Sequence, residues 1–179
     1  MSVLNQLKKA GGCGGGQAIY FAAKGACLAA NVPRIRRELW PDTIRIMNAL
    51  LPQLNLHRVR FCINSTLPPN WFTSADNVEG MTFGYTIFFK GSDYQKSWTK
   101  LQYLLHELVH VDQIRRRGDS ESNFACAYGE GYLKAGDYRK NAMEVEAYNF
   151  VANHRLTEDL PANLMNQASP RLLLAAEPT

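Results

Sequence analysis

The segment His106-Glu107-Leu108-Val109-His110 contains the residues whose types and spacing are best suited to chemistry. On an α-helix, two histidines four residues apart differ by about 40° in direction, so both imidazoles can reach one metal ion. Glu107 lies about 100° from His106, where it can contact water activated by that ion and act as a general base. Because the flanking residues are apolar, burying these polar groups is costly unless a partner such as a divalent cation satisfies them. The segment therefore predicts a catalytic metal site, with an ordinary buried polar cluster as the alternative.

A catalytic zinc ion usually takes three protein ligands, so one more is expected outside this segment. Glu144 and Glu146 fall on a later predicted helix and point about 160° apart, so only one of them can face the ion. Glu144 shares its face with Ala147, which is small enough to let the two helices pack closely, and we favour it over Glu146. We expect His154 and His57 to be surface residues. His154 lies near the end of the same helix, and His57 has no partner in the sequence.

The composition predicts a folded domain. Of 179 residues, 46% are hydrophobic and 20% are charged, which excludes global disorder. Residues 1–90 carry ten Lys or Arg against four Asp or Glu, whereas residues 91–179 carry ten against twelve. The basic half lacks the aromatic-interleaved basic stripe of a nucleic-acid groove, so we do not expect a nucleic-acid partner.

No stretch reaches the ~18 apolar residues that a membrane span requires. The most apolar candidate, residues 18–30, is interrupted by Lys24 and Gly25, and the preceding glycine run would break a signal peptide there. We expect synthesis in the cytoplasm, and the sequence leaves open export or injection without a clear signal peptide.

The four cysteines, Cys13, Cys27, Cys62 and Cys126, are widely separated and form no Cys-x-x-Cys pair. This spacing excludes a zinc ribbon and a thioredoxin-type motif. In a chain with a sizeable core we expect buried or idle thiols, with two disulfides as the alternative. Because Cys13 lies in a glycine run, one further hypothesis is that its thiolate reaches the zinc ion and keeps the enzyme latent.

The order of helices, then strands, then helices predicts an α+β fold, mostly helical, with a small sheet packed on a central active-site helix. Residues 1–16 should be a flexible glycine-rich lead, because glycine holds regular structure poorly. A single domain, residues 17–160, should follow, and residues 161–179 should form a C-terminal arm. Within that domain we expect N-terminal helices and the first strand in 17–80 and the metal-site core in 81–155. The predicted helices are 17–31, 43–51, 97–117, 123–135 and one from 138 or 141 to 155, and the predicted strands are 58–63 and 81–90.

The helix predicted to carry the His-Glu-x-x-His segment should be central and largely buried. Its apolar residues are distributed around the whole cylinder rather than along one stripe. Ser97 or Ser92 is suited to cap its start, and Gly118 to stop it.

Two strings of residues resemble known zinc peptidases. His-Glu-x-x-His on one helix, with a glutamate on a following helix, is similar to the gluzincin branch of zinc metallopeptidases. More narrowly, residues 105–113 (LHELVHVDQ), followed by Tyr138, Asn141 and residues 144–150 (EVEAYNF), resemble the eCIS core domain. This is a small domain, regarded as a peptidase, of bacterial contractile-injection-system effectors. The resemblance covers about residues 80–155.

The resemblance implies a zincin-like metallopeptidase with Zn²⁺ as its cofactor, held by His106, His110 and Glu144. Glu107 would take the proton of the attacking water and pass it to the leaving amine. Imidazole and carboxylate ligands also accept Mn²⁺, Fe²⁺ and Ni²⁺, so the ligands alone do not fix the metal.

Sites of this kind use a further donor to stabilise the oxyanion, and Tyr138, Tyr132 and Tyr128 are candidates, with aromatic packing as the alternative. Asp112 and Asn141 are candidates to hold the ligand histidines through their other ring nitrogens, although solvated or capping roles are equally compatible.

The leading hypothesis is therefore a zinc metallopeptidase that cleaves a protein or peptide substrate and has a secretion-system partner. Strand 81–90 would bind an extended peptide by strand addition. The main alternative is a catalytically silent zinc-bearing binding or assembly module of a bacterial secretion or injection system. Hydrolysis of a non-peptide amide or ester is a third option.

Overall fold

The computed structural model describes residues 8, 11–31, 37–67, 78–91, 95, 97–154 and 156. Its architecture is α+β and mostly helical, as predicted. The expected C-terminal arm, residues 161–179, and most of the first ten residues lie outside this described part. The α-helices are α2 (Gly12–Ala30), α3 (Pro41–Leu50), α4 (Trp98–Arg115), α5 (Glu121–Ala135) and α6 (Ala142–Asn153), and the 3₁₀ turns are η1 (Leu56–Arg58) and η2 (Tyr138–Lys140).

Among the described residues the sheet contains four short strands in the order β1-β2-β4-β3, so β3 lies at one edge of this part of the sheet. Strands β2 and β4 pair in parallel, and the two outer pairs are antiparallel. The single strand predicted over 81–90 is wrong. The chain turns back at Gly84, whose φ of 61° favours glycine, and a hairpin of two strands results. The strands are β1 (Arg37–Glu38), β2 (Arg60–Cys62), β3 (Gly80–Phe83) and β4 (Thr86–Phe89).

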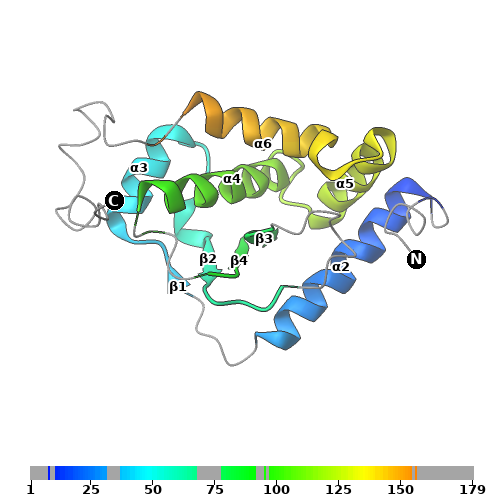
Figure 1. Ribbon diagram of the computed structural model, residues 1–179, viewed down its shortest axis with the longest axis horizontal. Coiled ribbons are helices and arrows are strands. Elements are labelled where there is room, and N and C mark those ends of the chain that lie inside the picture. The colour runs from blue at the N-terminus through cyan, green and yellow to red at the C-terminus, as the bar shows by residue number, and fades with distance from the viewer. Residues whose placement is uncertain are drawn as a thin grey trace.

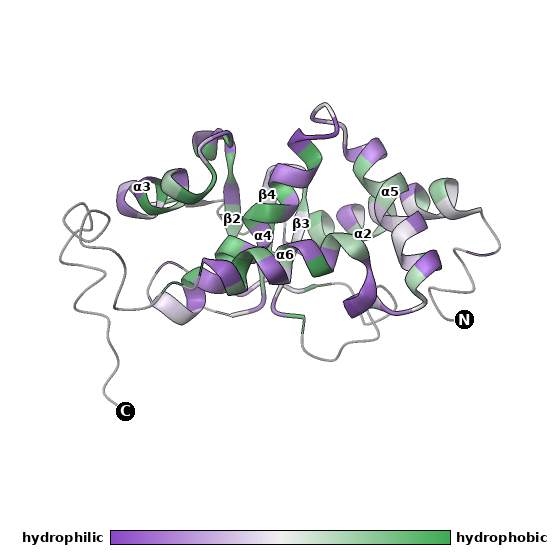
Figure 2. Cartoon of the chain, turned by 90° about the horizontal axis from the view of Figure 1, so that it is seen from above, coloured by the Kyte–Doolittle hydropathy of each residue, from purple (hydrophilic) through white to green (hydrophobic). Residues whose placement is uncertain are grey.

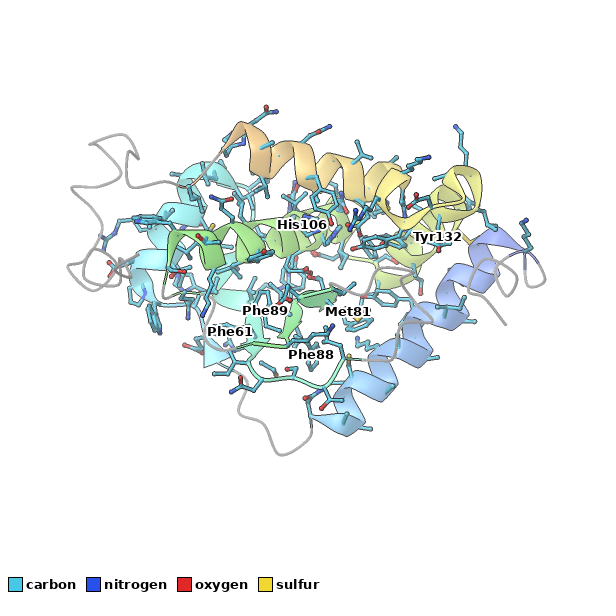
Figure 3. The ribbon with its side chains drawn as sticks, in the orientation of Figure 1. Phe61, Met81, Phe88, Phe89, His106 and Tyr132 are labelled. Carbon is cyan, nitrogen blue, oxygen red and sulfur yellow. A yellow bond between two sulfur atoms is a disulfide. The ribbon has the colours of Figure 1, made fainter. Side chains whose placement is uncertain are left out.

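Two hydrophobic cores lie on opposite faces of this sheet. Side chains alternate along β4, so Ile87 and Phe89 join the core formed with α3 and α4. Phe88 points the other way and joins the core formed with α2 and α5. Figure 3 labels Phe88 and Phe89 on the strand below α4. The sheet therefore fixes where these two groups of helices stand relative to each other.

Helix α4 is the central, largely buried helix that the sequence predicts. Ser97 caps its start by accepting a hydrogen bond from the backbone N of Lys100 at 3.3 Å. Ten of the eleven residues from Leu104 to Ile114 are buried, and His106 is the exception. Figure 1 shows the reason, since α4 lies between the strands and α6. The polar residues of this helix are thus held in a rigid apolar frame.

Helix α2 corrects the prediction of a flexible glycine-rich lead, because it begins at Gly12 and includes the rest of the glycine run. These glycines let α2 and α5 touch through their backbones. A Cβ added to Gly16 would lie 2.3 Å from Ala125 O, and one added to Gly129 would lie 2.6 Å from Gly16 Cα. The run is therefore a helix–helix contact, in which tertiary packing overrides the poor helix propensity of glycine.

A disulfide between Cys13 and Cys126 joins the same two helices. It corrects the expectation of four thiols outside disulfides, although Cys27 and Cys62 are buried thiols as expected. Because the Cys13 sulfur is bonded within this disulfide, the hypothesis that its thiolate occupies the metal site is wrong.

In the described part of the chain, no helix is both long enough and apolar enough for a membrane span. Figure 2 shows hydrophilic residues interspersed along α3, α5 and α6. This pattern is typical of helices with one buried and one solvated face.

Candidate metal centre

The side chains of His106, His110 and Glu144 meet where α4 packs against α6. The two histidine Nε2 atoms are 3.2 Å apart. His106 Nε2 lies 3.3 Å from Glu144 Oε2, and His110 Nε2 lies 3.3 Å from Glu144 Oε1. The helices approach closely here because Ala147, one turn after Glu144, is fully buried and has only a methyl side chain. Figure 3 shows His106 between α4 and α6. The three residues proposed as ligands are thus brought together.

The donor set fits a divalent metal ion. Three ligand atoms, one from each side chain, lie within 4.8 Å of one another. Glu144 is 1% exposed, and its Oε2 has no hydrogen-bond partner although the His106 ring lies beside it. A buried carboxylate oxygen without a partner is costly, and a cation at this point would satisfy it. Two imidazole nitrogens and one carboxylate oxygen form a set that catalytic zinc accepts.

Without a metal, a proton can supply the positive charge between His110 and Glu144. Burial alone would lower the pKa of His110, but the charge and hydrogen bond of Glu144 raise it to about 9. Burial alone would raise the pKa of Glu144, but the two imidazoles hold it well below its usual range. The pair is therefore charged at neutral pH, and a metal must displace the proton of His110 to bind.

Gln113 orients the His110 ring, and sequence reasoning missed this role. Gln113 Nε2 donates to Met143 O at 2.9 Å and to Glu146 Oε2 at 3.0 Å, which turns Oε1 toward His110. His110 Nδ1 lies 2.9 Å from that oxygen and donates to it. Because Gln113 holds Nδ1–H, Nε2 is the nitrogen that faces Glu144, and its lone pair becomes available to a metal ion once its proton is displaced. The sequence signal for this contact is the spacing, because residues three apart on a helix lie on the same face, as Gln113 and His110 do.

The three tyrosines proposed as oxyanion donors lie in different places. Tyr128 OH donates a hydrogen bond of 2.6 Å to Glu144 Oε1, so it supports the candidate ligand. Tyr138 lines the cavities on both sides of Glu107, and burial and then Glu144 raise its pKa, so the phenol keeps its proton. Tyr132 is buried and lines neither cavity. Tyr148, which is not one of these three candidates, places its ring 4.6 Å from that of His106.

Glu107 is buried beside the candidate metal ligands His110 and Glu144, and strand β3 holds it there. Thr82 Oγ1 donates to Glu107 Oε2 at 2.7 Å. Gly80 lets the strand come this close, because a Cβ at that position would lie 3.0 Å from Glu107 Oε1. The carboxylate reaches both adjacent cavities, as a general base must in order to meet a substrate.

Other polar candidates have different partners. Asp112 binds Arg115 and Arg116, and Asn141 caps α6, so neither of these two candidates holds a ligand histidine. Glu146 binds Arg116 and Gln113 away from the two histidines, in agreement with the preference for Glu144. His57 and His154 are both exposed, as expected.

Two hollows flank the Glu107 carboxylate. One is a narrow cavity of about 50 Å³ between His110, Glu144 and aromatic residues of α2 and α5. The other is a cleft of about 280 Å³ beside His106, bordered by residues 78–80 and by α4 and α6. Residues 78–80 line the larger cleft, and residues 80–83 of β3 line the narrow cavity.

The comparisons with known proteins concern the same elements. Residues 70–118 match the eCIS core domain. This match includes β3, β4 and α4 with both histidines and Glu107, and it ends before Glu144. It confirms the eCIS resemblance over residues 80–118 and relates the chain to contractile injection systems. No curated protein and no solved structure matches the chain.

Proposed function

We propose that the protein is a zincin-like, zinc-dependent metallopeptidase. The observation that supports this proposal most is the convergence of His106, His110 and Glu144 in a buried site where Glu144 Oε2 has no hydrogen-bond partner. The Glu107 carboxylate lies at the same site without belonging to the ligand group. Three protein ligands and an adjacent carboxylate are the set that zinc hydrolases use.

Each residue then has a chemical role. Bound Zn²⁺ would supply Lewis-acid polarisation of the scissile carbonyl and a lower pKa for water. Glu107 accepts the proton of the attacking water and passes it to the leaving amine. Thr82 keeps the Glu107 carboxylate in place, and the protonated phenol of Tyr138 donates a hydrogen bond to the developing oxyanion.

The edge strand supports a protein or peptide as the substrate class. In the sheet order β3 pairs on one side with β4. Its four residues, 80–83, line the narrow cavity, and Gly80 also lines the cleft beside Glu107. An extended peptide can add to such an edge through main-chain hydrogen bonds, and its scissile bond then lies at the carboxylate.

A second proposal is a catalytically silent zinc-bearing module, and the eCIS core domain match is the observation that favours it. In this case the metal centre would stabilise a binding surface for a component of an injection system. In both proposals the protein is synthesised in the cytoplasm and then either binds to that injection system or is exported by it.

Glu107→Gln separates the two proposals. The variant keeps a hydrogen-bonding side chain of the same size but cannot accept a proton, so we expect cleavage to fall at least about 100-fold. Zinc content should be unchanged, since Glu107 is not a candidate ligand. New N-termini in a digest of denatured proteins, counted by mass spectrometry, provide the readout.

The matched control is Glu130→Gln, an exposed position on α5. Cleavage by the control should equal that of the wild type. Equal cleavage by Glu107→Gln would show that Glu107 is not the base. Zinc binding by a wild-type protein that cleaves nothing would favour the silent module.

A further inference from the structure

The larger cleft, beside His106, has features of a binding site in its own right. Its walls are the strand edge at residues 78–80, Tyr103 and His106 on α4, and Tyr148 and Val151 on α6. An apolar cavity of about 150 Å³ holds a benzene ring, so a cleft of about 280 Å³ has room for a large side chain. The cavity on the other side of Glu107, at about 50 Å³, does not.

Exposed aromatic residues gather at this cleft. Tyr103 and Tyr148 are each 48% exposed, and they are two of four large hydrophobic residues exposed in the part of the chain that the structure describes. The other two, Phe21 and Val145, do not line it. Tyrosine offers a large, rigid contact surface at low entropic cost, and grouped exposed apolar residues mark binding sites.

Charges of both signs occur at the cleft. Arg139, Glu79 and Glu107 line it, and Thr82 holds the Glu107 carboxylate. The lining also includes Val78, Val151 and the two exposed tyrosines, which offer apolar contacts. We therefore expect this apolar part of the lining to select an uncharged side chain.

We infer that this cleft binds one large apolar side chain, of leucine or phenylalanine size, from an extended peptide whose main chain lies along β3. The inference rests on the proposed function and names its main specificity subsite. Since His106 and Glu107 form part of the cleft, a side chain seated there places the neighbouring peptide bond at the candidate metal centre. The narrow cavity is too small for such a side chain, so the cleft is the subsite that selects the substrate.

Peptide binding tests the inference without turnover. The probes are fluorescent peptides, Ala-Ala-X-Ala-Ala, with X as Gly, Leu, Phe, Lys or Glu, added to zinc-loaded Glu107→Gln protein. Fluorescence anisotropy gives the Kd of each peptide. Burying a leucine or phenylalanine side chain should tighten binding at least about tenfold over glycine. Equal Kd values for Gly and Phe, tightest binding by Lys or Glu, or no binding by any peptide would overturn the inference.

Two further variants locate the effect. Tyr103→Ser, made in the Glu107→Gln background, should remove most of the difference between Phe and Gly and leave the Kd of the Gly peptide nearly unchanged. Val145→Ser is the matched control, because Val145 is 39% exposed on α6 but does not line the cleft. It should keep the full difference. An unchanged Phe-to-Gly ratio in Tyr103→Ser would place the apolar subsite elsewhere.

Cleavage of the same peptides by wild-type protein separates this inference from the proposed function. Selective binding of Leu and Phe peptides without cleavage would keep the cleft and contradict the peptidase. Cleavage at equal rates whatever the residue X would keep the peptidase and contradict the cleft.

Discussion

Thr82 Oγ1 donates a 2.7 Å hydrogen bond to Glu107 Oε2, and through it the edge strand of the sheet holds the proposed general base on α4. Both side chains are buried. The strand that would bind the substrate and the carboxylate that would move its protons are therefore positioned as one unit. The arrangement links substrate position to base position without a flexible loop between them.

Replacing Thr82 with valine should lower kcat about tenfold and leave KM nearly unchanged. Valine keeps the shape of the side chain but removes the donor that fixes the Glu107 carboxylate. Thr82→Ser restores the hydroxyl and should recover most of the rate. Steady-state kinetics on one cleaved peptide measures this, with zinc content as a check. A normal kcat in Thr82→Val would mean that the hydrogen bond does not position the base.

Replacing Gln113 with leucine should weaken zinc binding about 10- to 100-fold, the range typical for loss of a group that orients a ligand histidine. His110 Nδ1 would lose its acceptor, and the ring would no longer be held with Nε2 toward Glu144. Competition with a chelator of known affinity measures the Kd. Gln53→Leu, at an exposed position, is the control and should bind zinc like the wild type. The same Kd in both variants would show that Gln113 is not needed for the site.

Zinc affinity should rise with pH up to about 9. Glu144 raises the pKa of His110 to about 9, so at pH 7 the ring is protonated and zinc must displace that proton. Between pH 7.5 and 9 the logarithm of the association constant should therefore increase by about one for each pH unit. Titrations in several buffers also count the protons released. A flat profile above pH 7.5 would show that His110 is already neutral, contrary to its contact with Glu144.

Gly16→Ala and Gly25→Ala should change stability in opposite directions, although both lie in α2. A Cβ on Gly16 would meet the backbone of α5, so we expect the free energy of unfolding to fall by about 1–3 kcal/mol. No atom lies within 4 Å of a Cβ on Gly25, so there alanine should raise it by about 0.5–1 kcal/mol. Urea denaturation measures both. Equal effects would contradict the close contact of α2 and α5.

Local patterns predicted the central part of the site. The spacing of His106 and His110 on an apolar helix placed both rings on one face, and α4 has the extent and burial expected of it. The small residue Ala147 pointed to Glu144 rather than Glu146, and the structure places Glu144 at the two histidines. These predictions depend on helical geometry, which a sequence encodes at short range.

Features that depend on distant partners were not predictable in the same way. The glycines near Cys13 form a helix because α5 lies against them, and the propensity of glycine alone predicts the opposite. The turn at Gly84 was hidden within a run of strand-forming residues. The contact of Thr82 with Glu107 joins positions 25 residues apart, which no local pattern shows.

The central claim is that His106, His110 and Glu144 together hold one metal ion. Its most direct test is zinc content, measured on wild-type protein and on His106→Ala, His110→Ala and Glu144→Ala after removal of loosely bound metal. We predict about one zinc ion per wild-type chain and at least a tenfold loss of affinity in each variant. A wild-type protein without zinc, or three variants that keep it, would contradict the account.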